Sequence, residues 1–374
     1  MHILTAKKIF ASLALLIYMP SEVAAEFKPQ YFYKDWRLPP YKTAIVEKGS
    51  GNFKLLVHKT ATDKNDMQAV IKAKNIITEK PVLSLILIDE NNNIIFESYG
   101  GGASKTSLIK GWSMTKSMTS IALGQALCEG MIDSLGDKAS KYSKTLQGTA
   151  YGDATLKELL MMASGGTRSK NEGMPIANMN YDFGVLHKRT LRSSLIEFGV
   201  DHPNPANKGS FTYKGLDTAA ISILLSDINN SKFQQILSRN VWRKIGAEKN
   251  GEIVVDKNND ALPQSGFGAT ASDWARLAIY IRDSAKTNSC FGNFIKDATT
   301  RQISNRSDHA TAFQGYGYQF WTNNKFIQTK SAWLNGYGGQ RIGIDMKSGK
   351  IIVMLSYEMG AVLPVYKLFD EWTR

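Results

Sequence analysis

The sequence predicts an α/β fold in which both ends of the chain build one antiparallel sheet and a helical region is inserted between them. Three observations support this fold class. Strand patterns occur early, in VLSLILI and NIIFESYG; the middle of the chain is mainly helical in pattern; and strand patterns return near the end, in RIGIDM and KIIVMLSYE. We expect a ligand-binding cleft between the sheet and the helical part.

The first elements follow from local periodicity. A helix is expected over about 66–77, and VLSLILI and NIIFESYG flank the turn-rich DENNN as a strand pair. TLKELLMMASGG has helical spacing and stops at glycines, while TASDWARLAIYIRD has a Thr/Ser start and apolar residues at i, i+3 and i+4. Residues 166–210 are rich in Gly, Asn, Lys and Ser, which predicts long loops that wall the cleft.

The end of the chain predicts two hairpins and a helix. YGYQFWT and KFIQTKS flank Asn323-Asn324, and RIGIDM and KIIVMLSYE flank 347–349. A last helix is expected over about 362–372. The predicted organisation is a leader (1–25), an N-terminal extension (26–80) and one domain (81–372), with the helical lobe at about 111–310.

The first residues have the order of a secretory signal peptide. Two lysines precede an apolar run from Ile9 to Tyr18, and Val23-Ala24-Ala25 supplies a small-residue cleavage site, with cleavage expected after Ala25. The alternative is a membrane anchor, but the run is well short of the ~20 residues that span a bilayer. We therefore expect a periplasmic or secreted protein.

Charge and cysteine content limit the partners. The net charge of +13 is spread rather than gathered in basic runs, so we predict no nucleic-acid binding and only weak association with anionic envelope surfaces. An exported protein can bridge Cys128 and Cys290, but two cysteines are no disulfide framework. Because Cys128 falls inside an apolar helix pattern, we expect two unpaired thiols.

Ser113 and Lys116 stand three residues apart where the apolar pattern of GWSMTKSMTSIALGQAL begins. Residues i and i+3 share one face of a helix, so the Lys116 amine can reach the Ser113 hydroxyl. A serine hydroxyl is a poor nucleophile until a base takes its proton, and a lysine can be that base when burial or nearby positive charge lowers its pKa. The helix N-terminus adds N–H groups and a partial positive potential beneath a reacting carbonyl.

The S-x-x-K spacing alone is weak, because Ser107 and Lys110 have it too. That pair precedes Gly111 and the apolar run, so we assign it to a loop. For an isolated S-x-x-K, a capping serine and a solvated lysine are the more common explanation. The residues around Ser113 decide the matter.

The chain around Ser113 resembles the serine β-lactamase and penicillin-binding-protein superfamily. The resemblance is carried by SMTKSMTSIALGQALCEGMIDSLGDKASKY, followed by ATLKELLMMASGG. More narrowly, it is similar to the branch that holds esterases, class C β-lactamases and 6-aminohexanoate-dimer hydrolases. The resemblance covers about 80–372 and is strongest over 111–166. It implies a β-lactamase/transpeptidase-like fold, which is a sheet lobe with an inserted helical lobe.

The resemblance also implies roles for three side chains. Ser113 matches the acylated nucleophile and Lys116 its basic partner. The second motif, usually Tyr-x-Asn or Tyr-x-Ser, matches at Tyr213, a phenol that can pass a proton between nucleophile and leaving group. Its third position here is Gly215, so the usual side-chain amide or hydroxyl is missing.

The third motif, usually Lys-Thr-Gly or His-x-Gly, matches at Leu334-Asn335-Gly336. The resemblance implies an oxyanion hole made by the N–H groups of Ser113 and Tyr337, and substrate contacts at Asn335, Gly336 and Gly338. A glycine-rich turn between strands explains the same letters equally well. Leu334 replaces the usual lysine, and Arg341 supplies a positive charge only if its strand turns it inward.

Other hydrolase classes fit less well. GWSMT ends in threonine rather than the last glycine of a nucleophile elbow, and His187, His202 and His309 have no distinctive context. The sequence has no H-E-x-x-H and no cysteine cluster, so we expect neither a metal nor a cofactor.

The sequence therefore predicts an exported serine hydrolase that cleaves a small ester or amide through an acyl-enzyme on Ser113. The alternatives are a D-alanyl carboxypeptidase, a β-lactamase, and a non-catalytic ligand-binding or sensor relative, since a fold does not by itself imply a function.

Overall fold

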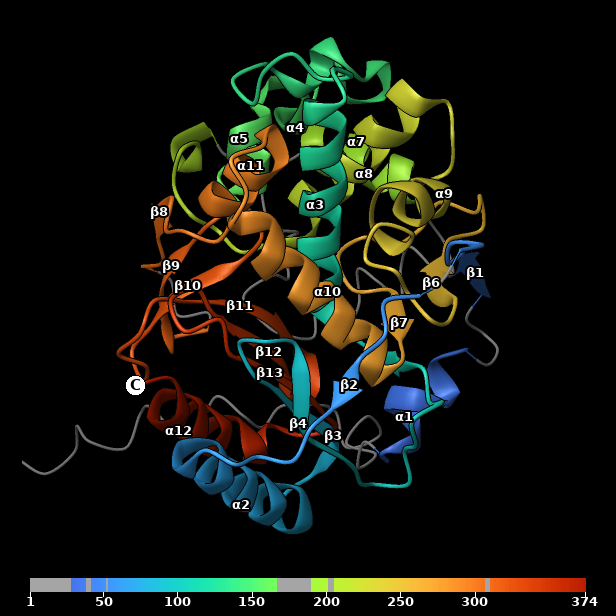
Figure 1. The fold of residues 1–374 in the computed structure, drawn as a ribbon. Coiled ribbons are helices and arrows are strands. Elements are labelled where there is room, and N and C mark those ends of the chain that lie inside the picture. The colour runs from blue at the N-terminus through green and yellow to red at the C-terminus, as the bar shows by residue number, and fades with distance from the viewer. Residues whose placement is uncertain (1–27, 38–41, 52, 167–189, 201–204, 307–309) are drawn as a thin grey trace, which may run out of the picture.

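A nine-stranded sheet forms the base of the molecule (Figure 1). The structure is a computed structural model that describes residues 28–37, 42–51, 53–166, 190–200, 205–306 and 310–374. The strand order is β2 (Val57–His58), β4 (Asn93–Tyr99), β3 (Val82–Ile88), β13 (Ile351–Ser356), β12 (Gln340–Asp345), β11 (Ser331–Gly336), β10 (Trp321–Asn324), β9 (Phe313–Tyr316) and β8 (Ile303–Ser304). Early and late strands thus share one sheet, which confirms the predicted fold class.

The two faces of this sheet bury different helices, which is why β3 and β13 consist almost entirely of apolar residues. On β3, Leu85 and Leu87 pack with α2 (Lys64–Glu79) and α12 (Val362–Thr373), while Ile86 and Ile88 pack toward the helical lobe. Strands covered on both faces are near-continuous apolar runs. The helices α2 and α12 lie side by side below the sheet, as Figure 1 shows.

The helical lobe lies above the other face of the sheet. Its helices are α3 (Thr115–Cys128), α4 (Ala150–Asp153), α5 (Leu156–Leu160), α7 (Leu191–Val200), α8 (Gly215–Asn229), α9 (Phe233–Leu237), α10 (Ala271–Ala285) and α11 (Cys290–Ala298). The Thr/Ser start predicted for α10 is correct, since Thr270 caps that helix. On α5, Thr155 and Glu158 form a capping box, but the helix ends at Leu160, before the glycines expected to stop it. The expected helices over 66–77 and 362–372 are α2 and α12.

A second, four-stranded sheet was not predicted. It has the order β1 (Lys42–Val46), β6 (Gly251–Val255), β7 (Phe267–Ala269) and β5 (Ile109–Lys110). Two of its strands interrupt the region that the sequence predicts to be mainly helical. These strands are too short for periodicity to reveal, and their pairing joins distant parts of the chain. The short helix α1 (Gln30–Tyr33) packs beside β5.

Two of the expected connections are correct and one is wrong. The β3–β4 and β12–β13 pairs are the predicted antiparallel pairs. The hairpin expected around Asn323-Asn324 is wrong, because β10 continues through Asn324 and pairs with β9 after a turn at 317–320. Residues 325–330, expected in the second strand of that hairpin, connect β10 to β11. Asn323 does have a positive φ of 54°, so the asparagine signal is real but lies inside a strand.

The loop region expected over 166–210 is only partly described. Within it, α7 (Leu191–Val200) is a helix, so the loop assignment is wrong there. Its buried Leu191 and Leu195 are four residues apart, as on one helix face. Residues 167–189 and 201–204 of this region, and the leader 1–25, lie outside the described residues. In the described ranges, no helix has the length and apolar character to cross a bilayer.

The expectation of two unpaired thiols is wrong: Cys128 and Cys290 form a disulfide across 162 residues. Cys128 is the last residue of α3 and Cys290 is the first of α11. The two helices pack closely: the Phe294 ring of α11 is so near Gly124 of α3 that a Cβ there would lie 2.4 Å from it. Helix periodicity predicted burial for Cys128, which is only half-buried, and it carried no information about which element lies opposite.

Candidate active site

Ser113 lies in a 3₁₀ turn, Trp112–Met114, directly before α3. Trp112 has a φ of 50°, the left-handed region that costs about 1–3 kcal/mol for a residue with a side chain. The Thr115 hydroxyl holds the turn by donating to the Trp112 carbonyl at 2.7 Å. Strain of this kind persists where the surroundings fix the backbone, and here it presents Ser113 partly exposed above a buried helix.

Lys116 lies one helical turn further on and is 4% exposed. Its Nζ is 3.0 Å from the Ser113 Oγ and 2.7 Å from the main-chain oxygen of Gln264. The first distance confirms the contact that the S-x-x-K spacing predicts. A buried amine on a serine hydroxyl is the geometry by which a base activates that hydroxyl.

Tyr213 joins the pair from the segment before α8. Its ring lies 5.0 Å from the Lys116 Nζ and packs against Trp321, with ring centroids 5.1 Å apart. Burial raises the pKa of the adjacent Tyr316 well above its ordinary value, and the charges of Tyr213 and Asp217 add to the effect. Tyr316 therefore stays uncharged at neutral pH, and it packs edge-on against the Tyr213 ring.

A buried ion pair anchors the start of α8 beside Tyr213. The Lys214 Nζ lies 3.2 Å from the Asp217 carboxylate, and both side chains are at most 1% exposed. Ser164, from the ASGG segment, donates its hydroxyl to Asp217 at 2.6 Å. Burial raises the pKa of Asp217, while Lys214 and Ser164 act in the opposite direction. No local pattern in the sequence indicated this ion pair.

The third motif lies at the end of β11, next to the Ser113 turn. A Cβ on Gly336 would lie 2.2 Å from the Gly111 carbonyl oxygen, so the two backbones are in direct contact. The Tyr337 ring packs edge-on against Trp112 at 5.3 Å between centroids. Gly338 has a φ of 69°, and a Cβ there would lie 2.4 Å from the Phe32 ring of α1. The motif and the nucleophile are thus brought together.

The register of β11 separates the side chains of this motif. Asn335 pairs with Arg341 and Leu334 with Ile342, and partners across a ladder share a face. Leu334 is fully buried toward the helical lobe. Asn335, 9% exposed, lies on the opposite face, and its Oδ1 has no hydrogen-bond partner among the described residues.

Arg341 does not turn toward Ser113. Its guanidinium donates to the main-chain oxygens of Gly336 and Gln340 and to the Tyr366 hydroxyl of α12, at 2.8–2.9 Å. Arg341 thus stabilises the end of the sheet. It does not supply the positive charge that is missing at Leu334, where the motif usually has a lysine.

The other sequence candidates are not part of this cluster. Ser107 lies in a turn, where its hydroxyl accepts from the Ser104 N–H, and Lys110 lies in β5 with its amine 4.0 Å from the Trp112 ring centroid. His187, His202 and His309 lie outside the described residues. In the described ranges, no group of three or more His, Cys, Asp and Glu side chains is arranged to hold a metal.

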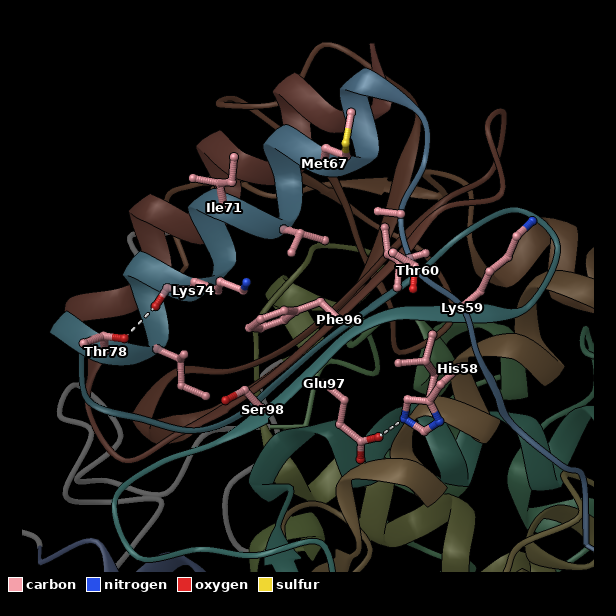
Figure 2. A pocket seen from close by; sticks show the side chains of 15 residues that line it. His58, Lys59, Thr60, Met67, Ile71, Lys74, Thr78, Phe96, Glu97 and Ser98 are labelled. Atoms are coloured by element: carbon pink, nitrogen blue, oxygen red, sulfur yellow. Dashed lines mark hydrogen bonds and ion pairs between the residues drawn. The ribbon is translucent and has the colours of Figure 1, made fainter.

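A groove of about 810 Å³ lies elsewhere, between α2 and β4 (Figure 2). Met67 and Ile71 of α2 line one side, and His58 and Glu97, 2.5 Å apart, lie on the other. None of the candidate catalytic residues lines it, so this groove does not belong to the Ser113 site.

Comparison with known proteins agrees with this geometry, which is that of a serine hydrolase. The family model described as Beta-lactamase matches residues 77–364, and the chain therefore belongs to the beta-lactamase family. The 6-aminohexanoate-dimer hydrolase of Paenarthrobacter ureafaciens is 21% identical over 291 residues, which are 74% of this chain and 73% of that protein.

Two solved structures share the fold. One, from Bacillus anthracis and provisionally named a 6-aminohexanoate-dimer hydrolase, has a TM-score of 0.70 at 19% identity and covers 89% of both chains. The other, EstCE1, a hydrolase with promiscuous acyltransferase activity, has a TM-score of 0.66 at 14% identity, covering 83% of this chain and 99% of that one. At these identities the likeness concerns the fold alone.

Proposed function

We propose that this protein is an exported serine hydrolase that cleaves esters or amides of small molecules through a covalent acyl-enzyme on Ser113. One observation carries the proposal: the buried Lys116 amine lies 3.0 Å from the Ser113 hydroxyl at the start of α3. A capping serine with a solvated lysine would not bury the amine.

The chemistry follows from these positions. As the Ser113 oxygen attacks the substrate carbonyl carbon, its proton passes to the Lys116 amine. The N–H groups of Ser113 and Tyr337 stabilise the negative oxygen of the tetrahedral intermediate. Collapse breaks the bond to the leaving alcohol or amine, which takes the proton by way of Lys116 and Tyr213. Water then cleaves the acyl-enzyme and restores the serine.

Export is supported by the leader pattern and by the disulfide. Disulfides persist in oxidising compartments and are rare in cytosolic proteins, and here Cys128 and Cys290 are paired. The net charge of +13 favours weak association with anionic envelope surfaces.

The test is intact-mass analysis after exposure of the mature protein to p-nitrophenyl butyrate, a linear p-nitroanilide and benzylpenicillin. We expect a mass increase of one acyl group on the wild type and none on Ser113→Ala. Ser107→Ala is the matched control, since Ser107 has the same spacing to a lysine but lies in the turn before β5. Acylation that persists in Ser113→Ala would show that Ser113 is not the nucleophile. An absence of acylation in the wild type would favour the non-catalytic alternative.

A further inference from the structure

The N-terminal segment 28–37 contacts the nucleophile turn, Trp112–Met114, although it lies outside the matched family region. The segment holds α1 and a 3₁₀ turn, Asp35–Arg37. The family model begins only at residue 77. The contacts of this segment are therefore features of this chain to which the family match assigns no role.

Trp36 anchors the segment to the second sheet. Its side chain is fully buried, and its indole N–H donates to the Leu108 carbonyl at 3.3 Å, just before β5. A Cβ on Gly268 of β7 would lie 2.2 Å from the Trp36 ring, so the ring packs directly on that strand. The Arg37 guanidinium adds an ion pair of 3.3 Å with Glu252 of β6. Because these contacts fix the segment, α1 has a defined place beside the nucleophile turn.

Phe32 of α1 packs between the nucleophile turn and the third motif. Its side chain is fully buried. Its ring centroid lies 6.2 Å from that of Trp112, with the ring planes inclined at 56°, which is within the usual range for an aromatic pair. A Cβ on Gly338 would lie 2.4 Å from the Phe32 Cε1 and 2.7 Å from its Cζ, so the ring edge lies against the Gly338 backbone. One ring therefore contacts the residue before Ser113 and the residue after Tyr337.

The Trp112 ring is enclosed by other side chains as well. The Tyr337 ring packs edge-on against it with centroids 5.3 Å apart, the Tyr31 ring lies at 6.0 Å, and the Lys110 amine lies 4.0 Å from its centroid. Packed interiors have few voids and transmit displacements. A change at Phe32 is therefore passed to the Trp112 side chain, whose main chain continues directly into the nucleophile.

We infer that Phe32 is a positioning residue: it holds the turn that presents Ser113 against the third motif that presents the Tyr337 N–H group. The inference rests on the proposed function, in which the N–H groups of Ser113 and Tyr337 stabilise the tetrahedral intermediate. Phe32 acts through Trp112 and Gly338 rather than by contact with the substrate. Residues 28–37 thus belong to the catalytic architecture and are not a separate extension.

Two variants of Phe32 and one matched control test this role. Leucine lacks the Cε1 and Cζ atoms that lie against Gly338, so Phe32→Leu removes that contact and stays apolar. Phe32→Met keeps most of the volume with a flexible chain in place of the ring, and it decides the test if Phe32→Leu does not fold. Phe96→Leu is the control, because Phe96 is a buried phenylalanine of β4 that lines the separate groove of Figure 2. Circular dichroism verifies folding, and urea denaturation gives the stability of each variant.

We expect Phe32→Leu to lower the single-turnover acylation rate with p-nitrophenyl butyrate roughly 10–100-fold with little change in KM, because a small misplacement of reacting groups costs rate. Phe32→Met should change the rate in the same direction. Phe96→Leu should lose stability and keep the wild-type acylation rate. A phenylalanine that only fills the core would behave like Phe96.

A transition-state analogue gives the second readout. n-Butylboronic acid accepts the serine oxygen and becomes tetrahedral, so it engages the donors that stabilise the intermediate. Phe32→Leu should raise its inhibition constant by about the same factor by which the acylation rate falls, whereas Phe96→Leu should leave that constant unchanged. Displaced N–H groups explain both changes, while a loss of stability alone explains neither.

A wild-type acylation rate and wild-type boronic acid inhibition in the folded Phe32 variants would overturn the inference. Equal losses in the Phe32 and Phe96 variants would overturn it as well, since they would reflect stability alone. If the wild type is not acylated at Ser113, the proposed function fails and the inference fails with it. If the wild type is acylated and the folded Phe32 variants match Phe96→Leu, only the inference fails.

Discussion

Gly336 lies against Gly111 so closely that no side chain fits between them: a Cβ on Gly336 would be 2.2 Å from the Gly111 carbonyl oxygen. The contact joins the end of β11 to the backbone just before the nucleophile. Since the oxygen belongs to the main chain, a substitution cannot be absorbed by a side-chain rotation. The contact therefore links the backbone that precedes Tyr337 to the backbone that precedes Ser113.

We therefore predict that Gly336→Ala lowers kcat/KM for p-nitrophenyl butyrate by ~10²-fold, because a displacement of about 1 Å in a reacting constellation costs that much. Gly51→Ala is the control, since a Cβ there meets nothing within 4 Å. Steady-state kinetics on folded protein checks this. Equal activity in both variants would mean that the β11 end does not take part in catalysis.

Lys116→Ala and Tyr213→Phe should each slow acylation by ~10²–10⁴-fold, the range for one positioned proton-transfer group. Their effects should not add, because both groups serve one proton path. The measurement is the single-turnover acylation rate of the two single variants and the double variant. Additive effects would show that Lys116 and Tyr213 act independently.

Asp217→Asn should destabilise the protein by ~3–5 kcal/mol, because it leaves the Lys214 ammonium buried without its counter-charge. Lys214→Met combined with Asp217→Leu should cost much less, since it removes both charges together. Urea denaturation of the single and double variants gives the comparison. A double variant as unstable as the single one would indicate that the Ser164 contact, rather than the charge pair, dominates.

Reduction of the Cys128–Cys290 disulfide should lower the free energy of unfolding by roughly 2–5 kcal/mol, because the bond closes a long loop in the unfolded chain. Thermal melting with and without dithiothreitol measures the effect. The Cys128→Ser, Cys290→Ser double variant should melt at the lower temperature and show no further response to the reductant. An unchanged melting temperature after verified reduction would contradict the prediction.

Sequence periodicity correctly predicted the contacts that form within a single helix or a single hairpin. Ser113 and Lys116 are one turn apart, so their contact follows from helix geometry alone. The β3–β4 and β12–β13 pairs follow from apolar runs around short turns. In each case the partners are neighbours in the sequence.

Relations between distant segments could not be predicted in this way. Gln264 contacts Lys116 across 148 residues, and Cys128 bonds Cys290 across 162. Nothing local to Gln264 indicates a catalytic site, and an apolar helix position predicts burial for Cys128 but no partner. The turn predicted at Asn323-Asn324 is wrong for a related reason: asparagine pairs are common in turns, but here strand pairing with β9 extends β10 through Asn324.

The last prediction concerns the substrate. A cation that holds a substrate carboxylate is worth ~1.5–3 kcal/mol as a charge-assisted hydrogen bond. Leu334 stands where the family's lysine would supply it, and Leu334 is fully buried. Arg341 is engaged on the other face with Tyr366. We expect p-nitrophenyl butyrate to be hydrolysed with a higher kcat/KM than benzylpenicillin, and linear amides to come second.

The comparison of kcat/KM for the ester, the anilide and the penicillin decides this, with Arg341→Ala as the matched variant. Because its guanidinium binds main-chain oxygens and Tyr366, Arg341→Ala should lower stability and leave the ester-to-penicillin ratio unchanged. A kcat/KM for benzylpenicillin equal to or above that for the ester would refute the prediction. Lys110 would then be the first lysine to replace. Its buried amine lies 4.0 Å from the centroid of the Trp112 ring, and Trp112 directly precedes Ser113.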